Sequence, residues 1–151
     1  MLKQTDILKA VITLLKMKYP AAATNYYTDE IVEGFKQPCF FVKIIKSRNT
    51  ETKNINSNIL SIILTYFADS KANKQLSFLD CEDTINELFG ICFKVADRFL
   101  QIKSISAERI GENQDVLQLT INIDYFDSTG YDGNFGYDLM QNLNMDYINK
   151  N

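Results

Sequence analysis

The 151 residues fit a single domain, because one hydrophobic core usually serves a chain of this length. Apolar residues make up 46% of the chain and charged residues 23%, which excludes a disordered or fibrous protein. The absence of histidine excludes His-based catalysis and His metal clusters, and no apolar run approaches the roughly 20 residues that span a bilayer. Residues 1–18 lack the features of a secretory signal, so we expect a protein made and used in the cytosol.

Charge is unevenly distributed within a net charge of −3. Residues 1–53 carry nine Lys or Arg against five Asp or Glu, whereas residues 54–151 carry seven against fourteen. A subunit with a positive and a negative part could stack on copies or on partners through complementary charge. Scattered solvated charges explain the same pattern at least as well.

The first predicted element is an amphipathic helix that lies across a sheet. Its apolar stripe recurs at helical spacing and consists of Ile7, Leu8, Val11, Ile12, Leu14 and Leu15. Thr5 is the expected N-cap and Pro20 ends the helical run.

Two strands are predicted next, joined by a polar connection. Residues 34–38 form a turn that leads into a strand over residues 39–46, a β-branched and aromatic run. The polar residues 47–57 predict an exposed, mobile hairpin loop. Residues 59–67 are dense in Ile, Leu, Tyr and Phe, which predicts a central strand buried on both faces.

A second helix and two more strands complete the pattern. Apolar spacing predicts the helix over residues 78–91, with Ser77 and Asp80 as a capping box. In residues 99–110 the inward-facing residues change from even-numbered to odd-numbered positions near Lys103 and Ser104, which predicts a β-bulge. In residues 116–126 apolar side chains alternate with polar ones, so one face of that strand should be buried and the other exposed to solvent. The inward residues of these two strands are Leu100, Ile102, Ile105, Ala107, Leu117, Leu119, Ile121, Ile123 and Tyr125.

The predicted fold class is α+β, a four- to five-stranded antiparallel or mixed sheet with two helices packed on one face. We expect one domain over residues 1–127 and a C-terminal Gly/aromatic extension over residues 128–151. This extension is too polar to form its own core, yet its aromatic content suits contact with a neighbouring subunit or partner. The alternatives are that it folds back over its own domain or stays disordered. Its candidate contact residues are Tyr131, Phe135, Tyr137 and Met140.

No pattern in the chain predicts catalysis, a cofactor or a metal. Cys39, Cys81 and Cys92 form no CxxC pair, so we expect three reduced, buried thiols. The glycines at 130, 133 and 136 lack the pattern and the lysine of a nucleotide loop. Acids such as Glu82 and Asp83 suit a solvated helix face.

A local basic group precedes the midpoint of the chain. It consists of Lys43, Lys46, Arg48 and Lys53, of which the last three are candidate partner contacts. The sequence pI is near 5.0 and no recognition motif follows, so we expect no sequence-specific nucleic acid. The group suits an acidic protein surface, and the solvated side of a hairpin is an equal alternative.

Residues 33–42, Glu-Gly-Phe-Lys-Gln-Pro-Cys-Phe-Phe-Val, resemble the most recognisable block of a family of small phage tail terminator proteins. Members occur in myophages, defective prophages and phage-tail-like bacteriocins. The resemblance extends over residues 1–127, and its distinctive residues are Gly34, Phe35, Pro38, Phe40 and Phe41. Gly34 and Pro38 are expected to shape the turn, and Phe40 and Phe41 to be core or sheet residues.

The resemblance implies a non-enzymatic ring, a homo-oligomer and typically a hexamer, at the head-proximal end of the tail. Its implied partners are the tail tube protein and a neck or collar protein, with the sheath protein a further candidate. Such a protein would be assembled in the bacterial host cytoplasm and then become part of the virion or tail-like particle, with no membrane partner. The alternatives are a neck or head-completion protein, a monomeric ligand-binding domain, and an enzyme that works without histidine.

Overall fold

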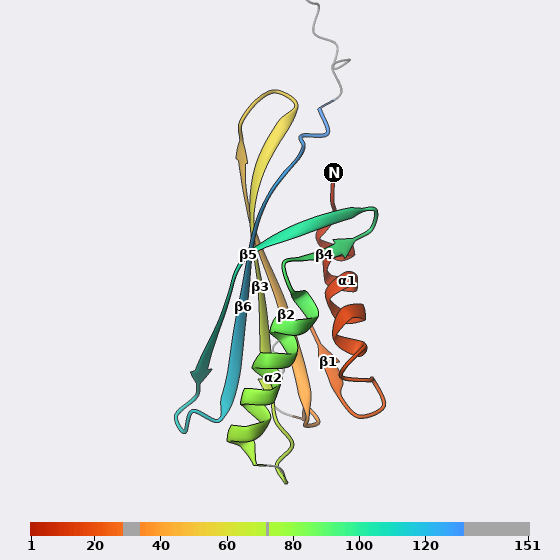
Figure 1. Ribbon diagram of the computed structural model, residues 1–151. Helices are drawn as coiled ribbons and strands as arrows, with labels where there is room; N and C mark the ends of the chain where they lie inside the picture. The colour runs from red at the N-terminus through yellow and green to blue at the C-terminus, as the bar shows by residue number, and fades with distance from the viewer. Residues whose placement is uncertain (29–33, 72, 132–151) are drawn as a thin grey trace, which may run out of the picture.

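The computed structural model describes residues 1–28, 34–71 and 73–131. Within these residues, two helices and six strands follow one another (Figure 1). They are α1 (Gln4–Lys16), β1 (Asn25–Tyr27), β2 (Cys39–Thr50), β3 (Ile55–Phe67), α2 (Lys74–Phe89), β4 (Cys92–Val95), β5 (Arg98–Ile110) and β6 (Val116–Ser128). The strands form one sheet in the order β1-β2-β3-β6-β5-β4, in which only the β1–β2 pair is parallel.

The α+β class and the mixed sheet are confirmed, but the predicted strand count is too low. The two missed strands are β1 and β4, at the two edges of the sheet. They contain three and four residues, too few for alternation to stand out from the surrounding loops. Both are held by pairing with a longer neighbour rather than by a pattern of their own.

Both helices lie on one face of the sheet, here called the inner face (Figure 1). The core forms between that face and the buried side of each helix: Ile7, Val11 and Leu15 from α1, and Phe78, Cys81, Ile85 and Phe89 from α2. The predicted stripe of the first helix therefore faces the sheet. On β6 the alternation is confirmed, since Leu117, Leu119, Ile121, Ile123 and Tyr125 are all buried.

The opposite face of the sheet, the outer face, carries no helix among the described residues. The prediction that β3 is buried on both faces is therefore wrong. Its even-numbered residues from Leu60 to Tyr66 are buried in the core, whereas Ile63 is only half-buried and Ile59 is 46% exposed. The sequence shows that this strand is apolar on both sides, but it does not show whether the outer side is covered by the same chain.

The β2–β3 hairpin is longer and more regular than predicted. Residues 47–57 are exposed for the most part, as expected, but only residues 51–54 form the loop, because β2 continues to Thr50 and β3 starts at Ile55. The register is unbroken from Cys39↔Phe67 to Thr50↔Asn56. Backbone pairing, not burial, makes these polar residues extended.

Three local predictions need correction and one is confirmed. The N-cap of α1 is Lys3 without a side-chain bond, not Thr5. The second helix starts at Lys74, where Asn73 accepts a hydrogen bond from the N–H of Gln75, so the proposed cap at Ser77 and Asp80 is wrong. Ala107 is exposed. The bulge in β5 is present, as a register shift between Ile102 and Ser104.

Candidate functional site

The outer face is a long strip on which apolar side chains alternate with polar and charged ones. Cross-strand neighbours alternate along it, so that Ile59 lies opposite Ser47 and Asp124, and Ile63 lies opposite Lys43 and Thr120. The large apolar side chains that solvent reaches on it are Ile45, Ile55, Ile59 and Phe126. Phe126, 64% exposed, is the most open of the four. Such a strip is characteristic of a surface that another protein covers.

One end of the outer face is closed by aromatic rings. Phe35 lies 4.7 Å from Phe67 and 5.5 Å from Phe41 between ring centroids, and Tyr27 lies 5.2 Å from Phe41. Phe35 thereby covers the outer side of the β2–β3 pair where the turn enters β2. Ring contacts at these distances stabilise this end of the outer face.

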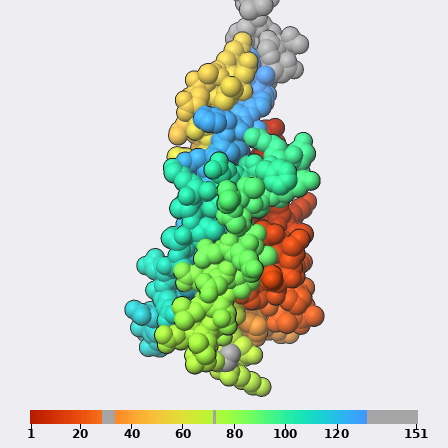
Figure 2. Space-filling model, in the orientation of Figure 1, coloured from red at the N-terminus to blue at the C-terminus, as the bar shows by residue number. Residues whose placement is uncertain are grey.

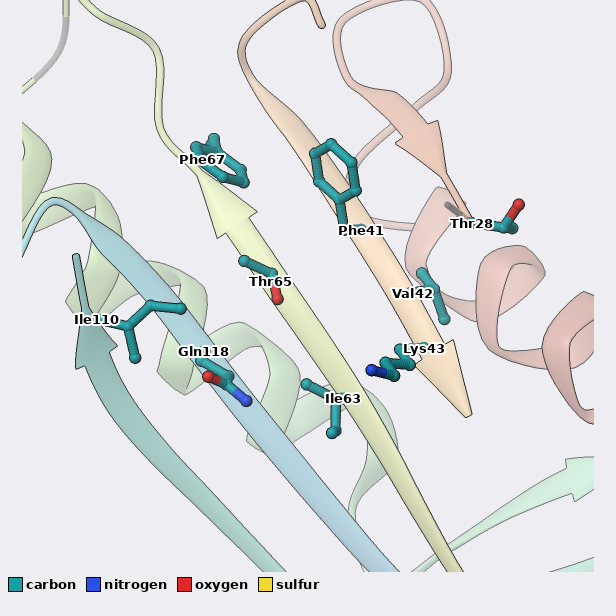
Figure 3. Close-up of a pocket in the computed structure, with 9 residues that line it drawn as sticks. All are labelled: Thr28, Phe41, Val42, Lys43, Ile63, Thr65, Phe67, Ile110 and Gln118. Carbon is teal, nitrogen blue, oxygen red and sulfur yellow. The ribbon is translucent and has the colours of Figure 1, made fainter. Parts of the chain in front are cut away.

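A hollow of about 520 Å³ opens beside the aromatic cluster (Figure 3). Phe41 and Phe67 form its apolar end, and Lys43, Thr65 and Gln118 supply polar groups. The remaining lining comes from Thr28, Val42, Ile63 and Ile110. Among the described residues no acid approaches Lys43 closely enough to form an ion pair.

The residues of the recognised block occupy the turn before β2 and its first residues. Gly34 has φ +83°, a conformation that favours glycine, and Pro38 follows a cis peptide bond. Pro38 accepts a hydrogen bond from the N–H of Asn25 at 3.1 Å, which attaches β1 to the start of β2. Phe40 is buried in the core against Tyr19 and Tyr66, whereas Phe41 lies half-buried on the outer face. The block therefore joins the core to the aromatic end of the outer face.

The far end of the sheet extends beyond the helices as a slender projection, here called the arm: residues 46–57 of the hairpin and residues 126–131 (Figure 1). Thr129 joins the two parts, since its N–H donates to the carbonyl of Asn54 and its hydroxyl donates to that of Lys53. The Lys53 ammonium lies 4.7 Å from the centroid of the Tyr131 ring. Two of the predicted contact residues, distant in sequence, are thus brought together.

The other predicted contact residues divide into two groups. Lys46 and Arg48 line a second hollow of about 400 Å³ at the root of the arm, together with Met1, Leu2, Lys3 and Gln4. We call it the basic hollow, because Lys3, Lys46 and Arg48 have no acidic partner among the described residues. Phe135, Tyr137 and Met140 lie outside the described residues.

Asp127 fastens the root of the arm to the N-terminal segment. Its buried carboxylate accepts hydrogen bonds from the N–H of Leu2 at 2.6 Å and from Arg98 at 3.1 Å. Burial opposes ionisation, but the backbone N–H groups of Leu2 and Ser128 and the charges of the Met1 amino group and Arg98 outweigh it and lower the pKa of Asp127. The carboxylate is therefore charged at neutral pH.

Polar atoms without partners lie next to this carboxylate on the inner face. Among residues 1–28, 34–71 and 73–131, no partner forms a hydrogen bond with either side-chain polar atom of Asn58, with Oδ1 of Asn56 or with the hydroxyl of Tyr125. Asn58 lies opposite Tyr125, and Asn56 opposite Asp127. Buried carboxamides of this kind reduce stability. The root of the arm is therefore an end of the core where buried polar groups lack hydrogen bonds within the described residues.

The two long edges of the sheet are only partly paired in the described chain. β1 pairs with residues 39–41 of β2, which leaves residues 42–50 without a strand on that side. β4 pairs with residues 98–101 of β5, which leaves residues 103–110 without one. Unpaired backbone N–H and C=O groups at such edges are available to a further strand.

Reactive chemistry finds little support in the described part of the chain. No group of three or more His, Cys, Asp or Glu there could hold a metal ion. Burial raises the pKa of Cys39 to about 11 and that of Cys81 to about 12, so both thiols stay protonated and unreactive. The prediction of three buried thiols is wrong for Cys92, which is exposed on the edge strand β4.

Sequence reasoning missed most of the outer face. It identified the wet side of β6 but assigned Ile59 and Ile63 to a buried strand, so their joint patch with Phe126 was not recognised. The sequence does contain a pattern that indicates this face. In β3 apolar residues occur at both even-numbered and odd-numbered positions, whereas in the neighbouring strand β6 one of the two sets is mostly polar. Such a mismatch between adjacent strands indicates a face that the chain itself does not bury.

Comparison with known proteins places the chain in a family. No curated protein sequence matches it. One solved structure, whose title states no function, has a TM-score of 0.47 and 11% identity over 87% of this chain and 99% of that one, which is too weak to bear on fold or function. None of the described helices is long and apolar enough to cross a membrane. The family model described as "Phage tail terminator protein" matches residues 6–132, and the chain therefore belongs to the phage tail terminator family.

Proposed function

We propose that this protein forms a hexameric ring at the head-proximal end of a phage or phage-tail-like tube. The ring caps the finished tube, ends its polymerisation and joins it to a neck or collar protein. Its direct partners are further copies of the chain and the tail tube protein, with the sheath protein a third partner in a contractile particle. Assembly takes place in the host cytoplasm, before the protein becomes part of the particle.

The observation that carries this proposal is the family match over residues 6–132, which makes the protein a structural component of a phage tail. The structure adds a reason why such a protein needs partners. Ile45, Ile59 and Phe126 are large apolar side chains left in solvent along one uncovered sheet face. Covering them would release ordered water and stabilise a complex.

The partly open sheet edges support closure into a ring. The two edges of one subunit differ in sequence and in direction, so contact between an edge of one copy and a different surface of the next is heterologous. Heterologous contacts close into a ring when the rotation between neighbouring copies divides a full turn, and otherwise they give an open filament. No reactive group is needed for this activity, only complementary surfaces.

A head-completion or neck protein is the alternative closest to this proposal, since it would also act as a ring. A monomeric ligand-binding domain is a further alternative, and the hollow beside Phe41 and Phe67 is the feature that it would use. We assign that hollow to a side chain of a partner subunit, because it opens onto the same uncovered face as Ile63.

Electron microscopy of particles assembled without this protein tests the proposal. We expect tubes of irregular and excessive length, because nothing stops tube polymerisation. Tubes of uniform native length that fail to join a neck would refute the terminator and favour the neck protein. Complete particles with tails of native length and no defect would refute both the terminator and the neck protein.

A further inference from the structure

We propose that the basic hollow of one subunit receives the exposed face of α2 from a second copy of this chain. The inference rests on the proposed self-association and names the surfaces that make it. The hollow lies at the root of the arm, and its cations are Lys3, Lys46 and Arg48. The occupant is a helix face that is both acidic and apolar.

The exposed face of α2 has an unusual composition for a solvated helix. Asp80, Asp83 and Glu87 follow one another at spacings of three and four residues and are all exposed. Leu76 and Leu79 lie on the same side of the helix, 59% and 47% exposed. Two large apolar side chains flanked by three acids suit a basic surface with an apolar floor.

The basic hollow supplies such a floor. Leu2 lines it with a side chain that packs in the core, and its N–H donates to Asp127 at 2.6 Å, which holds it in place. Met1, 68% exposed, is the large apolar side chain available for contact. The positive end of α1 adds to the potential of the three side-chain cations, because Lys3 is its N-cap.

These two surfaces cannot meet within one subunit. In Figure 2, which shows the face that carries α2, the helix occupies the lower half of the surface, whereas the N-terminal segment and the arm occupy the upper half. Figure 1 shows the same separation along the length of the sheet. The contact must therefore join different copies, and because the two surfaces differ it is heterologous, as a ring requires.

Within the described residues the charged side chains of both surfaces form few ion pairs, although the Lys46 ammonium lies 5.6 Å from the centroid of the Tyr125 ring. Of the three acids, Glu87 alone has an ion partner in the described chain, Lys18 at 4.0 Å, with both side chains more than half exposed. Asp80 and Asp83 have none there. Because the two surfaces carry opposite charge, this pairing is favoured over contact between like copies of either surface.

Charge reversal on each side provides the test. The double variant Lys46→Glu with Arg48→Glu should weaken salt-sensitive self-association about tenfold or more, and Asp80→Lys with Asp83→Lys should do the same. Mixing the two variants in equal amounts should restore association. When the two variants alternate around a ring, each reversed hollow meets a reversed helix and each native hollow meets a native helix, so every contact joins opposite charges. The matched control is Lys9→Glu with Lys94→Glu, an equal change of charge on exposed lysines elsewhere, which should have no effect.

Sedimentation equilibrium of the full chain at low ionic strength measures these effects, and circular dichroism verifies that each variant is folded. Native protein that stays monomeric at millimolar concentration overturns the inference, and so does a mixture that fails to recover. Over-long tubes in the deletion particle together with a failed charge swap would refute this pairing alone. A successful swap together with tubes of native length would refute the terminator role instead.

Discussion

The fastening of the arm by Asp127 gives the sharpest prediction about stability. We expect Asp127→Asn to lower the free energy of unfolding by about 2–3 kcal/mol at pH 7. Each hydrogen bond to a charged group contributes roughly 1.5–3 kcal/mol, and the amide keeps one acceptor while placing an N–H₂ group against the Leu2 or Ser128 N–H. Arg98 adds less, because its side chain is 40% exposed and its pairing is screened by water.

The pH dependence of this loss has a defined sign. The folded pKa of Asp127 is lowered, so its stabilising effect is fully present above the pKa of the unfolded chain and disappears as pH falls through the folded value. The native protein should therefore lose this contribution only in acid, below about pH 4. The stabilities of the native protein and of Asp127→Asn should converge over that range.

The matched control for this prediction is Asp124→Asn. Asp124 also forms an ion pair, with Lys103 at 2.6 Å, but both side chains are largely exposed, so we expect a loss below about 1 kcal/mol. Urea denaturation followed by circular dichroism between pH 3 and pH 7, a range set about the unfolded carboxyl pKa, measures both variants. Equal losses for the two would refute the assignment of Asp127 as the fastening of the arm.

Three further predictions concern the core, the outer face and the thiols. Asn58→Leu should stabilise the protein by roughly 1–2 kcal/mol in thermal unfolding, because it removes a buried carboxamide that has no hydrogen-bond partner in the described part of the chain. A lower melting temperature would contradict this account of the arm root. Ile62→Ala should cost about 3 kcal/mol in urea denaturation and Ile59→Ala less than about 1 kcal/mol, since the first side chain is buried and the second is 46% exposed; similar costs would mean that the outer face is covered within the subunit. Cys92 should react with a thiol reagent in the folded protein while Cys39 and Cys81 react only after unfolding, and mass spectrometry that finds labelled Cys81 in the native state would argue against the core described here.

Sequence periodicity predicted the elements that span many residues. The stripe of α1 and the alternation of β6 are repeated enough times to stand out, and the parity slip near Lys103 located the bulge of β5 correctly. The short edge strands β1 and β4 escaped detection, because three or four residues show no period. The polar half of the hairpin escaped for a different reason: its strands exist through pairing with each other and not through an apolar side.

The candidate surfaces were only partly predictable. Lys46, Arg48 and Lys53 were selected as a basic group, yet their placement on a projecting arm depends on how far β2 and β3 extend past the helices. Composition alone could not tell whether a second apolar side of β3 meets a helix of this chain or a partner. A solvated helix face is predicted for Glu82 and Asp83, but the sequence does not reveal that Leu76 and Leu79 are exposed on the same helix.

Complementation of particles that lack this protein tests the central claim most directly, namely that the protein acts through its surfaces. The variant Ile59→Lys with Phe126→Lys alters two exposed side chains of the outer face and should leave the subunit folded. We predict that tubes made with this variant are as irregular and over-long as tubes made without any protein, whereas the native protein restores one length. Tubes of native length with the variant would contradict the claim that the outer face is an assembly surface.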